Sequence, residues 1–242
     1  MFSNIKKVIL LLILVFGFSA YSGDSAYANT KVMWGKTELK LGQIGKVTIL
    51  QDTPLVKINA NGSLSTVRTL KMGDEFRVYS YKSQQGGLYG VGGGSFVQLN
   101  KTKVKYETPS KSKLAQLALI KEVQQVVDLT NAERTKAGLK PLQIDTKLTK
   151  SAQAKSQDMK NKNYFSHTSP TYGSPFDQMK AFGVTYKSAA ENIARGQHNA
   201  SEVVKAWMES PGHRTNIMNR SYTHIGVGLS DSGYYWTQQF IQ

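Results

Sequence analysis

The sequence predicts an α+β protein in two parts: a small all-β region, then a region of helices that ends in a pair of antiparallel strands. Short runs of strand-forming residues, separated by Gly and Asn turn signals, fill residues 29–107. After residue 114 the apolar residues recur at helical spacing instead. Strand-formers return at residues 222–229 and 234–240, on either side of a Ser-Asp-Ser-Gly turn. Helices beside an antiparallel pair indicate a layered α+β domain.

The first 28 residues have the layout of a secretory signal peptide. Lys6 and Lys7 form a short positive region, and an almost unbroken apolar run covers residues 8–18. Ala26 and Ala28 are small residues at the positions that a signal peptidase requires. A membrane anchor would need about 20 apolar residues, more than this run offers. We therefore expect export, cleavage after Ala28, an extracellular or wall-associated protein, and no membrane-spanning segment after cleavage.

The composition excludes several classes of protein. The 242 residues include no cysteine, which rules out disulfides, thiolate metal sites and a lipid anchor on cysteine. The formal net charge is +15, which favours contact with anionic wall polymers or lipid headgroups. Nucleic acid is the other common partner of basic proteins. It is not expected here, because the chain carries an export signal and its Lys and Arg are scattered rather than clustered in a stripe.

The all-β region is expected to be a small barrel of short strands. Turn signals at residues 59–62 and 92–94 separate strand-forming runs at residues 47–50, 76–79 and 96–99. The layout of residues 71–76 and 87–93 resembles bacterial SH3-like wall-binding domains. A structural β module without a ligand is the alternative, because a fold alone does not establish a function.

Four helices are expected after a polar linker at residues 108–114. The first ends at Gly138, and the second places Leu148, Ala152 and Met159 on one face. The expected N-cap residues of the four helices are Ser110 or Ser112, Asp145, Ser174 and Ser201.

Three ionisable residues have surroundings that suit a functional site. His167 follows the second expected helix, among aromatic and hydroxyl-bearing neighbours. Glu191 is flanked by small apolar residues, and His213 follows a Pro-Gly pair that is expected to end the fourth helix and leave the imidazole on a turn. His198 lies in a polar Gln-His-Asn segment and is expected to be exposed and without a role.

These segments resemble the bacterial, cysteine-free branch of the CAP superfamily (cysteine-rich secretory proteins, antigen 5 and pathogenesis-related proteins). The matching motifs keep the family's order over residues 115–242, which we take as the CAP domain, and they lie at residues 131–134, 165–167, 190–193, 210–214 and 224–228. The resemblance implies an α-β-α sandwich whose cleft is lined by two histidines and two glutamates. Since the family's usual disulfides are absent, the core must hold the sandwich together.

Carried over by motif, the resemblance assigns His167, Glu191 and His213 to the cleft. Many family members have the second glutamate three residues after the tryptophan, where this chain has Ser210. Glu209 stands one residue earlier and is the candidate in its place. Arg214, next to the second histidine, is the candidate for contacting an anionic ligand.

The other motif residues have structural explanations. Asn131 and Arg134 lie one turn apart on the first expected helix and are expected to bond to neighbouring backbone. Asn192 is expected to hold a loop together through its amide. Trp207 and Ile193 are expected to lie in the core.

Two chemical interpretations of the cleft remain open. His167, Glu191 and His213 could be three ligands of a divalent metal such as zinc, whose bound water could attack an ester or amide. Alternatively, the same side chains form a hydrogen-bonded polar network that shapes the cleft. Glu191 and Glu209 leave glycan hydrolysis as a minor option, because a glycosidase needs two facing carboxylates.

The function expected from these features is that of a secreted envelope protein without enzymatic activity. Its SH3-like region and its charge would hold it at a wall polymer or another anionic surface, while the cleft binds a peptide, a lipid or a divalent metal. The alternative is a metal-dependent hydrolase acting on peptide or cell-wall material through His167, Glu191 and His213. Lipid or sterol carriage occurs within the family, but no feature of this sequence marks the apolar cavity that it requires.

Overall fold

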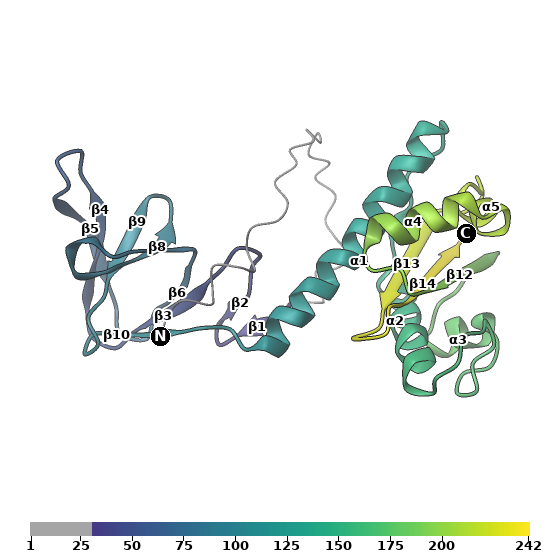
Figure 1. The fold of residues 1–242 in the computed structure, drawn as a ribbon, viewed down its shortest axis with the longest axis horizontal. Coiled ribbons are helices and arrows are strands. Elements are labelled where there is room, and N and C mark those ends of the chain that lie inside the picture. The colour runs from purple at the N-terminus through teal and green to yellow at the C-terminus, as the bar shows by residue number, and fades with distance from the viewer. Residues whose placement is uncertain (1–30) are drawn as a thin grey trace.

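The computed structural model describes residues 31–242, so the expected signal peptide lies outside the described residues. Within this range the strands β1 to β10 come first, and the part that contains the described α-helices follows, as Figure 1 shows for the labelled elements. The first part consists of β1 (Met33–Trp34), β2 (Thr37–Glu38), β3 (Gly45–Ile49), β4 (Thr53–Ile58), β5 (Leu64–Leu70), β6 (Glu75–Val78), β7 (Ser80–Lys82), β8 (Leu88–Gly92), β9 (Ser95–Gln98) and β10 (Val104–Glu107). A short 3-10 turn, Gln84–Gly86, precedes β8.

The first part is all-β, as expected, and its two larger sheets share one core. One sheet has the order β10-β3-β6 and the other the order β5-β4-β9-β8-β7. Both contribute to a cluster of buried side chains made of Val47, Ile49, Leu55, Leu70, Val78, Tyr89, Val97 and Val104. The three strand-forming runs of the sequence fall on β3, β6 and β9, and the expected turns connect β4 to β5 and β8 to β9.

The second part is a mixed layer structure around a four-stranded sheet. It consists of α1 (Lys111–Lys136), β11 (Gln143–Ile144), α2 (Thr146–Asn161), α3 (Pro175–Ala181), β12 (Ala189–Arg195), α4 (Ala200–Glu209), α5 (Pro211–Ile217), β13 (His224–Leu229) and β14 (Tyr235–Ile241). The sheet order is β11-β13-β14-β12, with the expected antiparallel pair β13 and β14 at its centre and β12 at one edge.

Helices cover both faces of this sheet, so the layers are helix, sheet and helix. On one face α2 lies so close to β13 that a Cβ at Gly226 or Gly228 would collide with the backbone of Leu148 or Ala152. On the other face α1 and α4 bury a cluster that includes Val126 and other side chains of the two helices and the sheet. This arrangement agrees with the expected α-β-α sandwich.

The helix starts at Ser110, Asp145 and Ser174 are confirmed, because each of these side chains accepts a hydrogen bond from the backbone of the helix it precedes. Of the two candidates for the first helix, Ser110 is the N-cap, and α1 begins within the segment expected to be the linker. The expected end of this helix is also confirmed, since Gly138 follows α1 with a φ of +70°.

Two expectations about the helices after residue 195 were wrong. The N-cap of α4 is Asn199 rather than Ser201, and its side chain accepts from the backbone N–H of Glu202 at 2.9 Å. His213 does not lie on a turn, because Pro211 starts a further helix, α5, instead of only ending α4. Proline suits the first position of a helix, where its missing N–H has no intrahelical partner. Strands β11 and β12 were not expected either.

Candidate functional site

Strand β12 carries the polar residues around which the candidate site is built. It pairs with β14 so that Glu191 lies opposite Gln239 and Asn192 lies opposite Gln238. Adjacent residues of a strand point to opposite faces. Glu191 and Gln239 therefore lie on the face covered by α2, and Asn192 and Gln238 on the face covered by α1.

Glu191 is a buried carboxylate with a partner for each oxygen. Its side chain is only 2% exposed. Oε1 lies 2.9 Å from Nδ1 of His167, and Oε2 accepts a hydrogen bond of 2.9 Å from Nε2 of Gln239. A buried charge is tolerated when such bonds satisfy it. The carboxylate is thus fixed in one orientation by a side chain from the loop after α2 and by one from the neighbouring strand.

His167 connects this buried carboxylate to the surface of the protein. Its side chain is 52% exposed, whereas the glutamate beneath it is almost fully covered. When the carboxylate is ionised it can only accept a hydrogen bond, and Nδ1 then carries the proton in the pair. In the neutral imidazole Nε2 is then left as an acceptor. The pair can therefore present a polarised imidazole to a ligand without any rearrangement.

His213 is placed next to this pair through its backbone. Its carbonyl oxygen accepts a hydrogen bond of 3.1 Å from Nδ2 of Asn192, the residue that follows Glu191 on β12. Asn192 also bonds to Gln238 and to Asn216 of α5, so it holds α5 against the edge of the sheet. Burial lowers the pKa of His213, and the charge of His167 lowers it further.

The structure does not bring Glu209 and Arg214 into this group. Glu209 ends α4 with its side chain 66% exposed, and its carboxylate lies 3.8 Å from Lys205 on the same helix. Arg214 is exposed on α5, and within residues 31–242 its guanidinium has no hydrogen bond or ion pair. Both side chains remain on the surface.

Reasoning from the sequence missed two residues that touch the pair. Gln239 and the preceding Gln238 are two fully buried amides in a strand that also holds Trp236 and Phe240, and such a polar pair could have drawn attention. Lys155 is fully buried on α2, and its Nζ donates a hydrogen bond of 2.6 Å to the carbonyl oxygen of His167. It shares the apolar face of α2 with Leu148, Ala152 and Met159, and a lysine on such a face is the signal that could have revealed it.

The structural roles expected of Asn131, Arg134, Trp207 and Ile193 are confirmed, whereas Asn192 lies on β12 rather than in a loop. Asn131 both donates to and accepts from the backbone of Leu142, and Arg134 donates to four backbone carbonyls. Trp207 and Ile193 are buried in the core. His198 is exposed, as expected, and packs against the ring of Tyr234.

The arrangement of donors does not fit a three-ligand metal site. The imidazole and the carboxylate bond to each other, and the second carboxylate oxygen bonds to Gln239. Over the part of the chain that the structure describes, no three His, Asp or Glu side chains are grouped in a way that could hold a metal ion. A divalent cation at Glu191 would have to displace at least one of these bonds.

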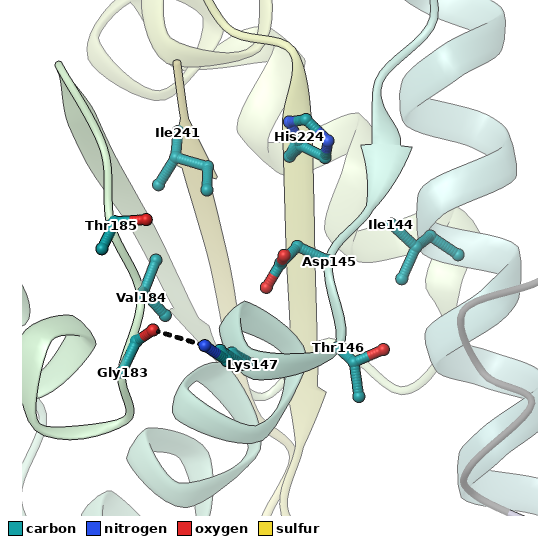
Figure 2. A pocket seen from close by; sticks show the side chains of 9 residues that line it. All are labelled: Ile144, Asp145, Thr146, Lys147, Gly183, Val184, Thr185, His224 and Ile241. Atoms are coloured by element: carbon teal, nitrogen blue, oxygen red, sulfur yellow. Dashed lines mark hydrogen bonds between the residues drawn. The ribbon is translucent and has the colours of Figure 1, made fainter.

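A separate hollow of about 380 Å³ lies at the other end of α2. Figure 2 shows its lining, with Asp145, Thr146 and Lys147 from the start of the helix and His224 and Ile241 from the central strands. Lys147 closes one side by donating to the carbonyl oxygen of Gly183. None of the residues expected in the cleft lines this hollow, so it is distinct from the His167–Glu191 pair.

Comparisons with known proteins agree with this architecture. Two proteins of Bacillus subtilis (strain 168) are similar to the chain: YkwD, 70% identical over 118 residues, and the membrane protein YlbC, 42% identical over 119 residues. Each alignment covers 49% of this chain, but only 46% of YkwD and 34% of YlbC, so the match spans less than half of each relative.

Among solved structures, an extracellular protein containing a SCP domain from Bacillus anthracis str. Ames has a TM-score of 0.52 and 29% sequence identity. That similarity covers 72% of this chain and 66% of the other. None of the helices within residues 31–242 has the length and apolar character that a membrane span requires. Residues 127–240 match the family described as CAP, the cysteine-rich secretory protein family, and the chain therefore carries a cysteine-free CAP domain over this range.

Proposed function

We propose that this protein is retained at the cell envelope and binds a peptide or lipid ligand at the His167–Glu191 pair, without catalysing a reaction. The observation that carries this proposal is the state of Glu191, whose two carboxylate oxygens are already bonded to His167 and Gln239. The carboxylate is buried and directed at these two partners, so it does not face a ligand as a nucleophile would, and the acceptor offered to a ligand is Nε2 of His167. The fixed pair suits recognition, because the imidazole is held ready for a ligand at no cost in side-chain entropy.

Retention at the envelope is assigned to the β region, which we propose to be SH3-like. Twelve Lys and Arg against five Asp and Glu lie in residues 31–107, so this part contributes much of the positive charge. Most of these lysines are exposed. Contact with anionic polymers would raise the local concentration of the CAP domain at the wall. The extracellular SCP-domain protein of Bacillus anthracis supports the same location.

Co-sedimentation with isolated bacterial cell wall tests the retention. Residues 29–242 are expected to sediment with the wall at low salt and to be released as the salt concentration rises, because exposed charges are screened. In the test variant Lys57, Lys101 and Lys105 become Gln, and in the matched control Lys136, Lys140 and Lys150 of the CAP region become Gln; all six are exposed. The proposal predicts weaker binding for the first variant alone. Equal losses, or wild-type protein left in the supernatant, would contradict it.

Ligand binding at the cleft is tested by following the imidazole signals of His167 and His198 by NMR. Solubilised wall peptides and phospholipid vesicles are titrated separately, and one of them is expected to shift the His167 signal while the exposed His198 serves as the internal control. No shift with either probe would count against the proposed ligand classes.

Elemental analysis of protein purified without an affinity tag tests the metal-dependent alternative. One zinc ion per chain that is lost in His167→Ala but kept in His198→Ala would instead favour the metal-dependent hydrolase.

A further inference from the structure

Lys155 is a buried cation without a carboxylate in contact. Its relative exposure is 0%, and within residues 31–242 no Asp or Glu oxygen lies within 4.0 Å of its Nζ. The ammonium donates to the carbonyl oxygen of His167 at 2.6 Å and lies 5.2 Å from the ring centroid of Tyr164. Burial lowers the pKa of Lys155, while the charges of Glu191 and Asp158 act in the opposite direction. If this position needed only a side chain to fill space, an apolar residue would do so without the free-energy cost of burying a charge.

Asp158 lies one turn further along the same helix and holds the same loop. Its Oδ2 accepts hydrogen bonds of 2.7 Å from the hydroxyls of Tyr164 and Ser169, and Oδ1 accepts one of 2.6 Å from Thr171. Burial alone would raise the pKa of Asp158, but these three hydroxyls lower it below its ordinary value. Two α2 side chains of opposite charge therefore bind residues 164–171 from beneath.

The loop depends on these side chains because its own backbone offers little. Ser169 and Gly173 form an isolated bridge. For residues 165–168, the described part of the chain contains no backbone–backbone hydrogen bond. The bond from Lys155 is the one that reaches the main chain of His167 itself. Without it, the bond to Glu191 would be the one hydrogen bond left to His167 among those described for residues 31–242.

We infer that Lys155 is a positioning residue of the site: its buried ammonium holds the backbone of His167 so that the imidazole meets Glu191, and Asp158 anchors the flanks of the same loop. This role rests on the proposed function, because fixing the imidazole of His167 before a ligand arrives is useful only if a ligand binds there. Its test needs no ligand, so it can fail independently of the wall and ligand experiments.

Lys155→Met tests the inference, because methionine keeps the bulk of the stem and removes the donor. The measurement is the imidazole ¹⁵N and ring-proton NMR signature of His167, which reports whether Nδ1 keeps its proton and its carboxylate partner. We expect this signature to be lost in Lys155→Met and to move to that of a freely exposed imidazole. The matched control is Ser156→Ala, which removes the adjacent buried bond of 2.9 Å to Thr237 without touching the loop. The control is expected to keep the wild-type signature.

An unchanged His167 signature in folded Lys155→Met would overturn the inference. So would equal loss in Ser156→Ala, because the effect would then be a general loosening of α2. If Lys155→Met does not fold, Lys155→Gln takes its place under the same criteria. The amide of glutamine is too short to make the bond made by the ammonium, so a wild-type signature in that variant would refute the inference equally.

Discussion

The β region and the CAP domain both bury cations, but they compensate them in different ways. In the β region Lys46 is 4% exposed and pairs with two carboxylates, at 2.8 Å from Glu75 and 3.8 Å from Glu107. In the CAP domain Arg134 and Lys155 are 1% and 0% exposed and donate instead to backbone carbonyls.

The choice between carboxylate and backbone partners follows from the kind of segment that each cation contacts. Lys46 joins neighbouring strands, whose backbones already bond to each other, so an ion pair between side chains is enough. Arg134 and Lys155 hold irregular segments whose carbonyls lack strand or helix partners, and a buried carbonyl must find a donor. Cations directed at the backbone thus mark the irregular parts of the CAP domain, and one of those parts carries His167.

The largest expected effect is the loss of Arg134. Its guanidinium donates to the carbonyl oxygens of Lys140, Ile217, Asn219 and Tyr222. Arg134→Met would leave these groups without their donor and should lower the free energy of unfolding by about 3–5 kcal/mol. Denaturant unfolding of the CAP domain, followed by tryptophan fluorescence, measures it.

Arg214→Met is the matched control, because this arginine of the same domain is exposed on α5. Its effect should stay within about 0.5 kcal/mol. If both variants lowered the free energy of unfolding equally, the comparison would fail, because a buried cation bonded to backbone carbonyls would then stabilise the fold no more than a surface charge.

The next effect is the strand ion pair of the β region. Glu75→Gln should cost about 2 kcal/mol, less than Arg134→Met, because the strands around the pair keep their own bonds. Burial would raise the pKa of Glu75, but hydrogen bonds from Lys46 and from the backbone N–H of Lys36 lower it below 4.5. A carboxylate whose pKa is lowered by folding stabilises the protein fully at pH values above its pKa in the unfolded chain. This stabilisation is lost as the pH falls through its pKa in the folded protein.

The stability difference between wild type and Glu75→Gln should therefore be constant at neutral pH and shrink below about pH 4.5. Urea unfolding at a series of pH values checks this. A difference that grows on acidification would mean that the pair is not ionised in the folded protein.

The smallest expected effect is the loss of a local interaction in the CAP domain, the N-cap of α4. Asn199→Ala removes the N-cap bond to Glu202 and should cost about 1 kcal/mol. Ser201→Ala, two residues later, should be close to neutral. Thermal unfolding of the two variants measures both. A larger loss for Ser201→Ala would restore the sequence-based N-cap and contradict the observed start of α4.

Much of the fold was predictable because its signals are local. Ser110, Asp145 and Ser174 start helices through bonds to residues three positions away, and these spacings can be read along the chain. Pro211 was misread because proline both follows one helix and begins the next, and the sequence around it does not separate the two.

By itself, the sequence determined the all-β and helical parts, the apolar face of α2 and the motifs that carry His167, Glu191 and His213. Only the tertiary structure decided which atoms meet. Glu191 bonds to Gln239, 48 residues away, because β12 pairs with β14 in one register, and Lys155 reaches His167 because the loop folds back over α2. Periodicity and capping report contacts within a turn or a strand, whereas partners across a sheet depend on register and loop path, which no local pattern encodes.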